Sequence, residues 1–147
     1  MALRERLSDE MKEAMKARDD LRLSAIRLIR SAVKNKDIEL KRELAEQEIV
    51  EVIASLVKQR RESIRLFGEA GRQDLVEKEE KELAVLLGFL PQQLRREDVA
   101  ELVDRVIAAS GAQGGKDMGR VMKALMPHVA GRADGKMVSD IVKEKLG

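Results

Sequence analysis

The stretch that decides the fold runs from residue 115 to residue 138 and reads GKDMGRVMKALMPHVAGRADGKMV. Its first half places apolar side chains on one face of a helix, at Met118, Val121, Met122 and Leu125. A turn around Gly131 separates this helix from a second short apolar pattern, and Asp117 stands where it can cap the first helix. Two small amphipathic helices joined by a Gly-rich basic turn, without evident catalytic groups, favour binding over bond-making.

On the N-terminal side, the chain continues the same helical pattern up to a break. Residues 96–110 predict another amphipathic helix, followed by a Gly-rich loop over 111–115. The apolar pattern stops at Pro91, and a proline directly after an apolar tripeptide ends a helix and redirects the chain. We therefore expect a domain boundary there, with a small three-helix bundle over 91–147.

The first 90 residues predict four further helices and no strand. Their apolar positions recur at helical spacing over about 2–18, 21–42, 46–68 and 73–87, and Asp19 or Asp20 can cap the second helix. The sequence therefore predicts an all-α protein with an N-terminal four-helix domain over 1–90 and a smaller C-terminal domain of three helices.

Composition narrows the functional class. The chain has 44% hydrophobic and 38% charged residues but only two aromatic ones, so Leu, Ile, Val and Ala fill the core, and the methionines are expected to help fill it. No cysteine is present, which excludes disulfides and thiolate chemistry. No apolar run resembles a secretory signal or a membrane span, so we expect a cytoplasmic protein that does not enter a membrane.

Two segments of the quoted stretch resemble a known module. Asp117–Met122 and Gly131–Lys136, with the apolar residues that follow, are similar to the tail of the B subunit of tRNA-dependent amidotransferases. The chain resembles the free-standing YqeY-like family more closely still, over essentially its whole length, including Ala25–Ala32, Gln59–Ser63 and Leu90–Leu94. The resemblance implies an all-helical, two-part chain.

The resemblance also implies a link to tRNA, because the amidotransferase tail contacts the outside of the tRNA fold. The family relation is to a glutamine-dependent carbon–nitrogen ligase, but the B subunit's catalytic body is absent from this chain. We therefore expect an accessory module of translation, without catalysis of its own and without a cofactor.

Other candidate sites have simpler explanations. The Gly111–Lys116 loop is one residue short of a nucleotide-binding loop, is followed by Asp117 instead of Ser or Thr, and comes after a helix. His128 is the only histidine, so it makes neither a triad nor a metal site, and a position at the surface or at a helix end is expected. Arg60 and Glu79 both project into apolar arcs, which predicts an ion pair between their helices.

The remaining candidates are basic clusters that could contact a phosphate backbone. The main set lies in the C-terminal domain and a weaker set in the second predicted helix: Lys116, Arg120, Lys123, Arg132 and Lys136, and then Arg27, Arg30 and Lys34. Without interleaved aromatic residues, binding would be led by phosphate contacts and sensitive to salt. The expected partner is tRNA or a tRNA-handling enzyme. The alternative is a helical interaction or regulatory protein with no RNA role, and the oligomeric state stays open.

Overall fold

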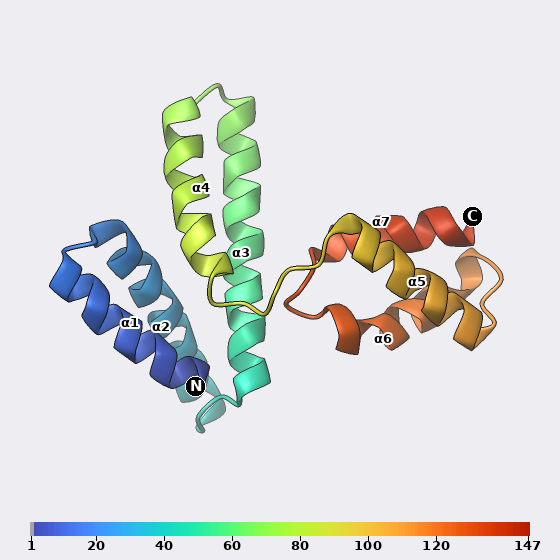
Figure 1. The fold of residues 1–147 in the computed structure, drawn as a ribbon, viewed down its shortest axis with the longest axis horizontal. Coiled ribbons are helices and arrows are strands. Elements are labelled where there is room, and N and C mark those ends of the chain that lie inside the picture. Colours follow the sequence, from blue (N-terminus) through green and yellow to red (C-terminus); the bar gives the residue numbers. More distant parts are fainter. Residues whose placement is uncertain (1) are drawn as a thin grey trace. The chain divides into compact units, whose positions relative to one another are not determined.

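The computed structural model describes residues 2–147, and every regular element in this range is helical (Figure 1). The all-α prediction is therefore confirmed. The helices are α1 (Leu3–Ala17), α2 (Asp20–Leu40), α3 (Glu46–Glu69), α4 (Gln73–Leu87), α5 (Arg96–Ser110), α6 (Met118–Val129) and α7 (Gly135–Leu146), with a 3₁₀ turn η1 (Gly115–Asp117) before α6.

The contacts of the chain divide it into two compact units, one up to Leu90 and one from Pro91 to Gly147. Each unit has its own apolar core, and no residue belongs to both. The division falls at the predicted boundary, but whether each unit is an independently folding domain stays a prediction.

The first unit consists of the α1–α2 and α3–α4 hairpins. Its centre contains Ile26, Ile29, Ile53 and Leu86, all fully buried. Phe89 closes one side of this core, and the Arg6 guanidinium stacks over its ring at 4.7 Å from the centroid. Burial of these aliphatic side chains is the main force that holds the two hairpins together.

The start of α2 follows the capping chemistry expected from the sequence. The Asp19 carboxylate accepts a hydrogen bond from the Arg22 backbone N–H at 3.1 Å. This satisfies one of the N–H groups that the first turn of a helix leaves unpaired.

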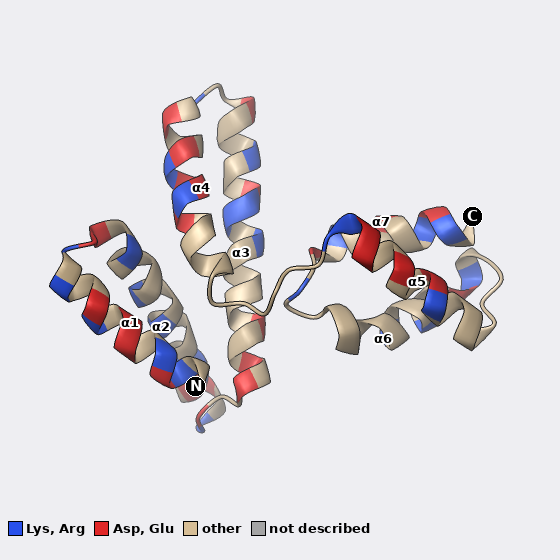
Figure 2. Ribbon diagram, in the orientation of Figure 1, with Lys and Arg blue, Asp and Glu red and all other residues tan. Residues whose placement is uncertain are grey.

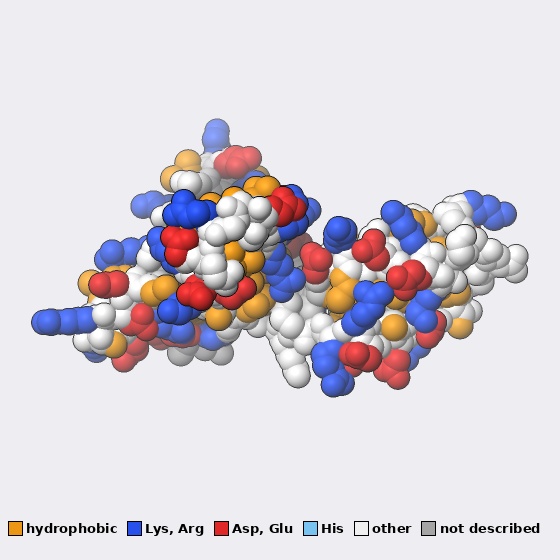
Figure 3. Space-filling model, turned by 90° about the horizontal axis from the view of Figure 1, so that it is seen from above, with side chains coloured by type: hydrophobic (Ala, Val, Ile, Leu, Met, Phe, Trp, Pro, Cys, Tyr) orange, Lys and Arg blue, Asp and Glu red, His pale blue; other side chains and the backbone are white. Residues whose placement is uncertain are grey.

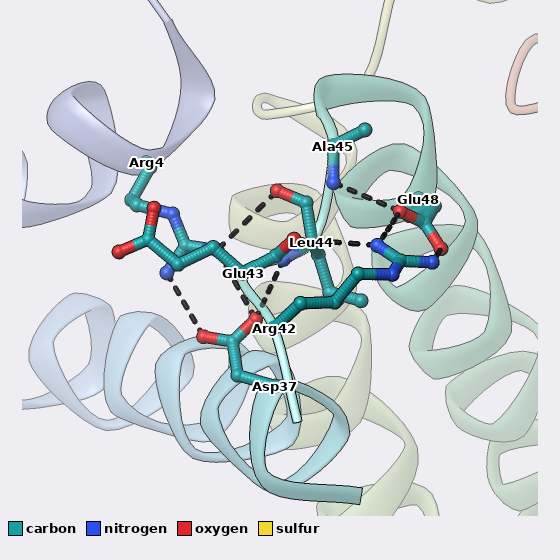
Figure 4. A network of polar contacts seen from close by, with 7 residues as sticks. All are labelled: Arg4, Asp37, Arg42, Glu43, Leu44, Ala45 and Glu48. Atoms are coloured by element: carbon teal, nitrogen blue, oxygen red, sulfur yellow. Dashed lines mark hydrogen bonds and ion pairs between the residues drawn. The ribbon is translucent and has the colours of Figure 1, made fainter. Parts of the chain in front are cut away.

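A polar network fixes the connection between α2 and α3 (Figure 4). The Asp37 carboxylate accepts from the Arg4 guanidinium at 3.0 Å and from the Leu44 backbone N–H at 2.8 Å, and these contacts lower the pKa of Asp37. Arg42 donates to Glu48 at 2.8 Å, and Ala45 donates its backbone N–H to the same carboxylate. Together they lower the pKa of Glu48 to about 2.

The α3–α4 hairpin contains the predicted ion pair. Arg60 of α3 contacts Glu79 of α4, as the sequence indicated, and it also lies 2.7 Å from Glu82. All three side chains are mostly shielded from solvent, with 21%, 15% and 14% exposed. One guanidinium therefore bridges two carboxylates at the hairpin interface.

The second unit packs α5, α6 and α7 around Val103, Val121, Leu125 and Val142. Asp117 occupies the N-cap position of α6, but the prediction that its side chain caps this helix is wrong. Its carboxylate accepts instead from the Gln113 backbone N–H at 3.0 Å. This bond closes the loop before α6.

The prediction that methionines fill the core holds only in part. Met11, Met118, Met122 and Met137 pack against a core, whereas Met15 and Met126 are 52% and 48% exposed. Helical spacing identifies the face of a helix, but the neighbour that covers that face depends on how the helices pack.

Candidate nucleic-acid interface

The α6–α7 turn displays two of the predicted basic residues, Arg132 and Lys136. Gly131 adopts the left-handed conformation with φ +73°, which an L side chain rarely adopts, and thereby reverses the chain after α6. Asp134 then caps α7 by accepting from the Met137 backbone N–H at 3.4 Å. The turn is thus shaped by its own sequence.

The segment after Pro91 holds this turn in place. The Leu94 backbone N–H donates to the Arg132 carbonyl at 2.7 Å. The Gln93 side-chain amide donates to the Gly131 carbonyl at 2.8 Å and to the Pro91 carbonyl at 3.0 Å. These contacts connect residues 91–94 to the α6–α7 turn, two segments that are far apart in the sequence. Gln93 had no assigned role there, because nothing local shows that its partner is 38 positions away.

Arg132 uses part of its hydrogen-bonding capacity within the turn and its neighbouring segments. It is half-buried, its Nε donates to the Gln92 carbonyl, and an Nη donates to the His128 carbonyl, each at 3.4 Å. Asp98 at the start of α5 has a lowered pKa, caused first by the hydrogen bond from the Arg95 backbone N–H and also by the nearby charge of Arg132. Both hydrogen bonds of Arg132 are long, and the guanidinium still carries donors for a further partner.

The exposed side of α6 and the turn before it carry the other three residues of the main set. Lys116 lies in η1, Arg120 and Lys123 are exposed on α6, and α6 contains no acidic residue (Figure 2). Arg120 pairs with Asp117 at 3.4 Å, whereas Lys116 and Lys123 form no ion pair within residues 2–147. His128 is exposed in the last turn of α6, as the sequence indicated.

The five main candidates are distributed along α6 and past its C-terminal end. Lys116 precedes α6, whereas Arg132 and Lys136 follow it, and a helix of 12 residues is about 18 Å long. The structure therefore separates them into an α6 group (Lys116, Arg120 and Lys123) and a turn group (Arg132 and Lys136). A structured RNA presents phosphates at such spacings, whereas a small anion does not.

The weaker candidates lie in the first unit. Arg27, Arg30 and Lys34 are exposed on α2 and line an open groove of about 950 Å³ beside α1. On the face shown in Figure 3, basic and acidic side chains are interspersed. The basic groups are therefore local features of α2, α6 and the α6–α7 turn.

Residues 2–147 bring together no group of three His, Asp or Glu side chains that could hold a metal ion. In that range no helix has the length and apolarity needed to cross a membrane.

Several curated proteins are similar to this chain, and each is named "Altered inheritance of mitochondria protein 41, mitochondrial". The one from Kluyveromyces lactis is 41% identical over 101 residues, covering 66% of this chain and 55% of that protein. The one from Lachancea thermotolerans is 39% identical over 87 residues, covering 58% and 46%. The one from Pyrenophora tritici-repentis is 32% identical over 146 residues, covering 97% and 80%. The chain spans about half the length of the first two relatives.

These relatives contradict the prediction of a cytoplasmic protein. At 32–41% identity they are named as mitochondrial proteins. The prediction rested on the absence of cysteines and of apolar runs, and neither feature distinguishes one compartment from another. A mitochondrial transit peptide is amphipathic and rich in Arg and Ser, so a search for apolar runs does not detect it.

The names of these relatives describe no enzymatic activity. The family model described as "Yqey-like protein" matches residues 4–146, which include both compact units and the α6–α7 turn. Because this match extends over nearly the whole length, the chain belongs to the YqeY-like family.

Proposed function

We propose that this protein is an accessory RNA-binding module that engages tRNA, directly or together with a tRNA-handling enzyme, through its C-terminal unit. The observation that carries the proposal is the charge of α6. Its two fully charged side chains, Arg120 and Lys123, are both basic and exposed, and the turn that displays Arg132 and Lys136 follows directly. Tail modules of tRNA-dependent amidotransferases, which this unit resembles, supply the tRNA link.

Binding would rest on phosphates and shape. The chain has no Trp or Tyr, Phe89 is buried and Phe67 is partly buried, so the described surface offers little for base stacking. The basic side chains from Lys116 to Lys136 are distributed along α6, which is about 18 Å long, and past its C-terminal end, which favours a folded RNA over a flexible single strand.

The proposal includes no catalytic role for this protein. His128 is the single histidine of the chain, and the half-buried carboxylates of Glu79 and Glu82 in the α3–α4 hairpin are paired with Arg60. We therefore place the protein beside an enzyme of carbon–nitrogen ligation as a partner, without a catalytic role of its own.

The test is tRNA binding measured by fluorescence anisotropy at increasing salt. We expect the logarithm of the association constant to fall linearly with the logarithm of salt concentration. The pair R120A/K123A should weaken binding and make the slope shallower by about 0.7–0.9 for each phosphate that the variant no longer neutralises. The pair R61A/R105A removes two exposed arginines from α3 and α5 and should leave binding unchanged.

A second variant separates charge from positioning. Gln93→Ala removes the amide that holds the Gly131 carbonyl but leaves every basic side chain in place. We expect weaker tRNA binding with an unchanged salt slope, because the turn group loses its fixed geometry. No binding at about 50 mM salt, or binding independent of salt, would refute the proposal.

A further inference from the structure

The N-terminal unit has a groove between α1 and α2 that the proposed RNA interface does not use. Its volume is about 950 Å³, and its apolar lining includes Leu7, Met11 and Met15 of α1. Leu7 is buried, whereas Met15 is 52% exposed. An apolar strip that begins in the core and continues into solvent is typical of a surface that another molecule covers.

Methionine suits such a surface. Its side chain is flexible and polarizable, so Met11 and Met15 can adapt to different apolar partners. The Arg30 guanidinium donates to the Met11 sulfur, which is a weak acceptor. A carboxylate would be a much stronger partner for this arginine.

The α2 side of the groove is basic. Arg27, Arg30 and Lys34 line it, are exposed, and follow one another at helical spacing on α2. Within residues 2–147 none of the three forms an ion pair with a carboxylate, unlike Arg42 and Arg65 of the same unit. This row of charge is therefore available to an acidic partner.

The groove has two acidic residues, Glu5 of α1 and Asp37 of α2. Asp37 is already bound by Arg4 and by the Leu44 N–H (Figure 4). Glu5 of α1 is exposed and disfavours a carboxylate on that side. An occupant would therefore turn its carboxylates toward α2 and its apolar face toward the methionines.

We propose that this groove docks an acidic amphipathic helix of a partner protein. The helix would lay its apolar face on Met11 and Met15 and pair its carboxylates with Arg27, Arg30 and Lys34. Since these residues span two turns, or about 10 Å, the matching carboxylates lie at positions i, i+3 or i+4, and i+7. RNA fits the groove less well, because its phosphates have no use for an apolar floor and no aromatic residue lines the groove for base stacking.

The test uses designed peptides and the full chain. The probe is a helical peptide of about 18 residues, above the length at which isolated helices become stable in water, with a Leu face and Glu at i, i+4 and i+7. A control peptide replaces each Glu by Lys. We expect the acidic peptide alone to bind, as measured by anisotropy or calorimetry.

Two groups of variants locate the binding. R27E/R30E/K34E should lower the affinity for the acidic peptide at least about tenfold, since each exposed charge pair contributes roughly a factor of two or three to the affinity. M15Q replaces an apolar side chain of the groove by a polar one and leaves Arg27, Arg30 and Lys34 unchanged. It should weaken binding of the acidic peptide. Lys36→Glu reverses a charge of α2 that lies outside this groove and should have little effect.

Each remaining outcome overturns the proposal. These are equal binding of both peptides, no binding of the acidic peptide, and loss of tRNA affinity but not of peptide affinity in the triple variant. A dimer of the full chain that this variant dissociates would assign the groove to self-association. Failure of the C-terminal RNA proposal is separate, because it is measured with Arg120 and Lys123.

Discussion

Arg60 is the residue on which the electrostatics of the α3–α4 hairpin depend. It contacts Glu79 and Glu82, and all three side chains are largely shielded from solvent. Removal of the guanidinium would leave two neighbouring carboxylates to repel each other in a poorly hydrated interface.

We expect Arg60→Met to lower the free energy of unfolding by about 2 kcal/mol, because a partly buried pair is intermediate between surface and fully buried ones. Urea denaturation monitored by circular dichroism measures the change. Arg65→Met is the matched control, because Arg65 lies on the same helix and also bridges two carboxylates, but its side chain is 54% exposed. Equal losses in the two variants would contradict the role of burial.

Glu48 makes stability depend on pH. Its pKa falls from the ordinary 4.5 to about 2 in the folded protein, because Arg42 and the Ala45 N–H stabilise the carboxylate. A lowered carboxyl pKa adds stability above the unfolded pKa, and that stability is lost as pH falls through the folded one.

The stability difference between the protein and Glu48→Gln should therefore be constant above about pH 5.5 and shrink between about pH 4.5 and pH 2. Unfolding curves at several pH values measure it. Glu80→Gln, at an exposed position of α4 without an ion pair in the described chain, should show no such change. A difference that stays constant down to pH 2 would contradict the assignment.

Among the elements, the α6–α7 turn shows how local chemistry and tertiary contacts combine. Gly131 supplies the left-handed conformation, Asp134 supplies the cap, and Gln93 and Leu94 fix the turn from another segment. The two basic side chains of the turn group therefore project from a defined backbone.

Gly131→Ala should destabilise the C-terminal unit by about 1 kcal/mol, because an L side chain disfavours positive φ. It should also weaken tRNA binding. Gly119→Ala is the matched control: this glycine is helical, has open space around its Cα, and should gain roughly 0.5 kcal/mol in helix propensity. Thermal unfolding of both variants measures these changes in stability. A Gly131→Ala variant with unchanged stability would show that the turn tolerates another geometry.

At the scale of the whole molecule, the chain has two apolar cores that share no residue. Ile53 is fully buried in the first and Val121 in the second. Because packing energy is local to a core, damage to one need not reach the other.

Val121→Ala should cost about 2 kcal/mol and speed amide hydrogen exchange only within residues 91–147. Ile53→Ala should do the same within the first unit. Residue-resolved exchange by NMR measures both. Faster exchange throughout the chain in either variant would show that the units unfold as one.

The helical class of the fold could be predicted from the amino-acid sequence alone, and the predicted boundary at Pro91 coincides with the division between the two compact units. Three signals depend only on a few neighbouring residues and can therefore be recognised in the sequence: helical periodicity, an N-cap such as Asp19, and a helix-ending residue such as Pro91. The Arg60–Glu79 pair was predictable for the same reason, since each charge stood alone in an apolar arc.

Contacts between distant segments became apparent from the three-dimensional packing. It added Glu82 to the Arg60 pair, tied Gln93 to Gly131, left Met15 exposed, and separated the basic candidates into groups on α2, on α6 and at the α6–α7 turn. These outcomes depend on the packing of helix faces against partners far away in the chain. Side-chain type and spacing specify which face of a helix is apolar or basic, but not what lies opposite.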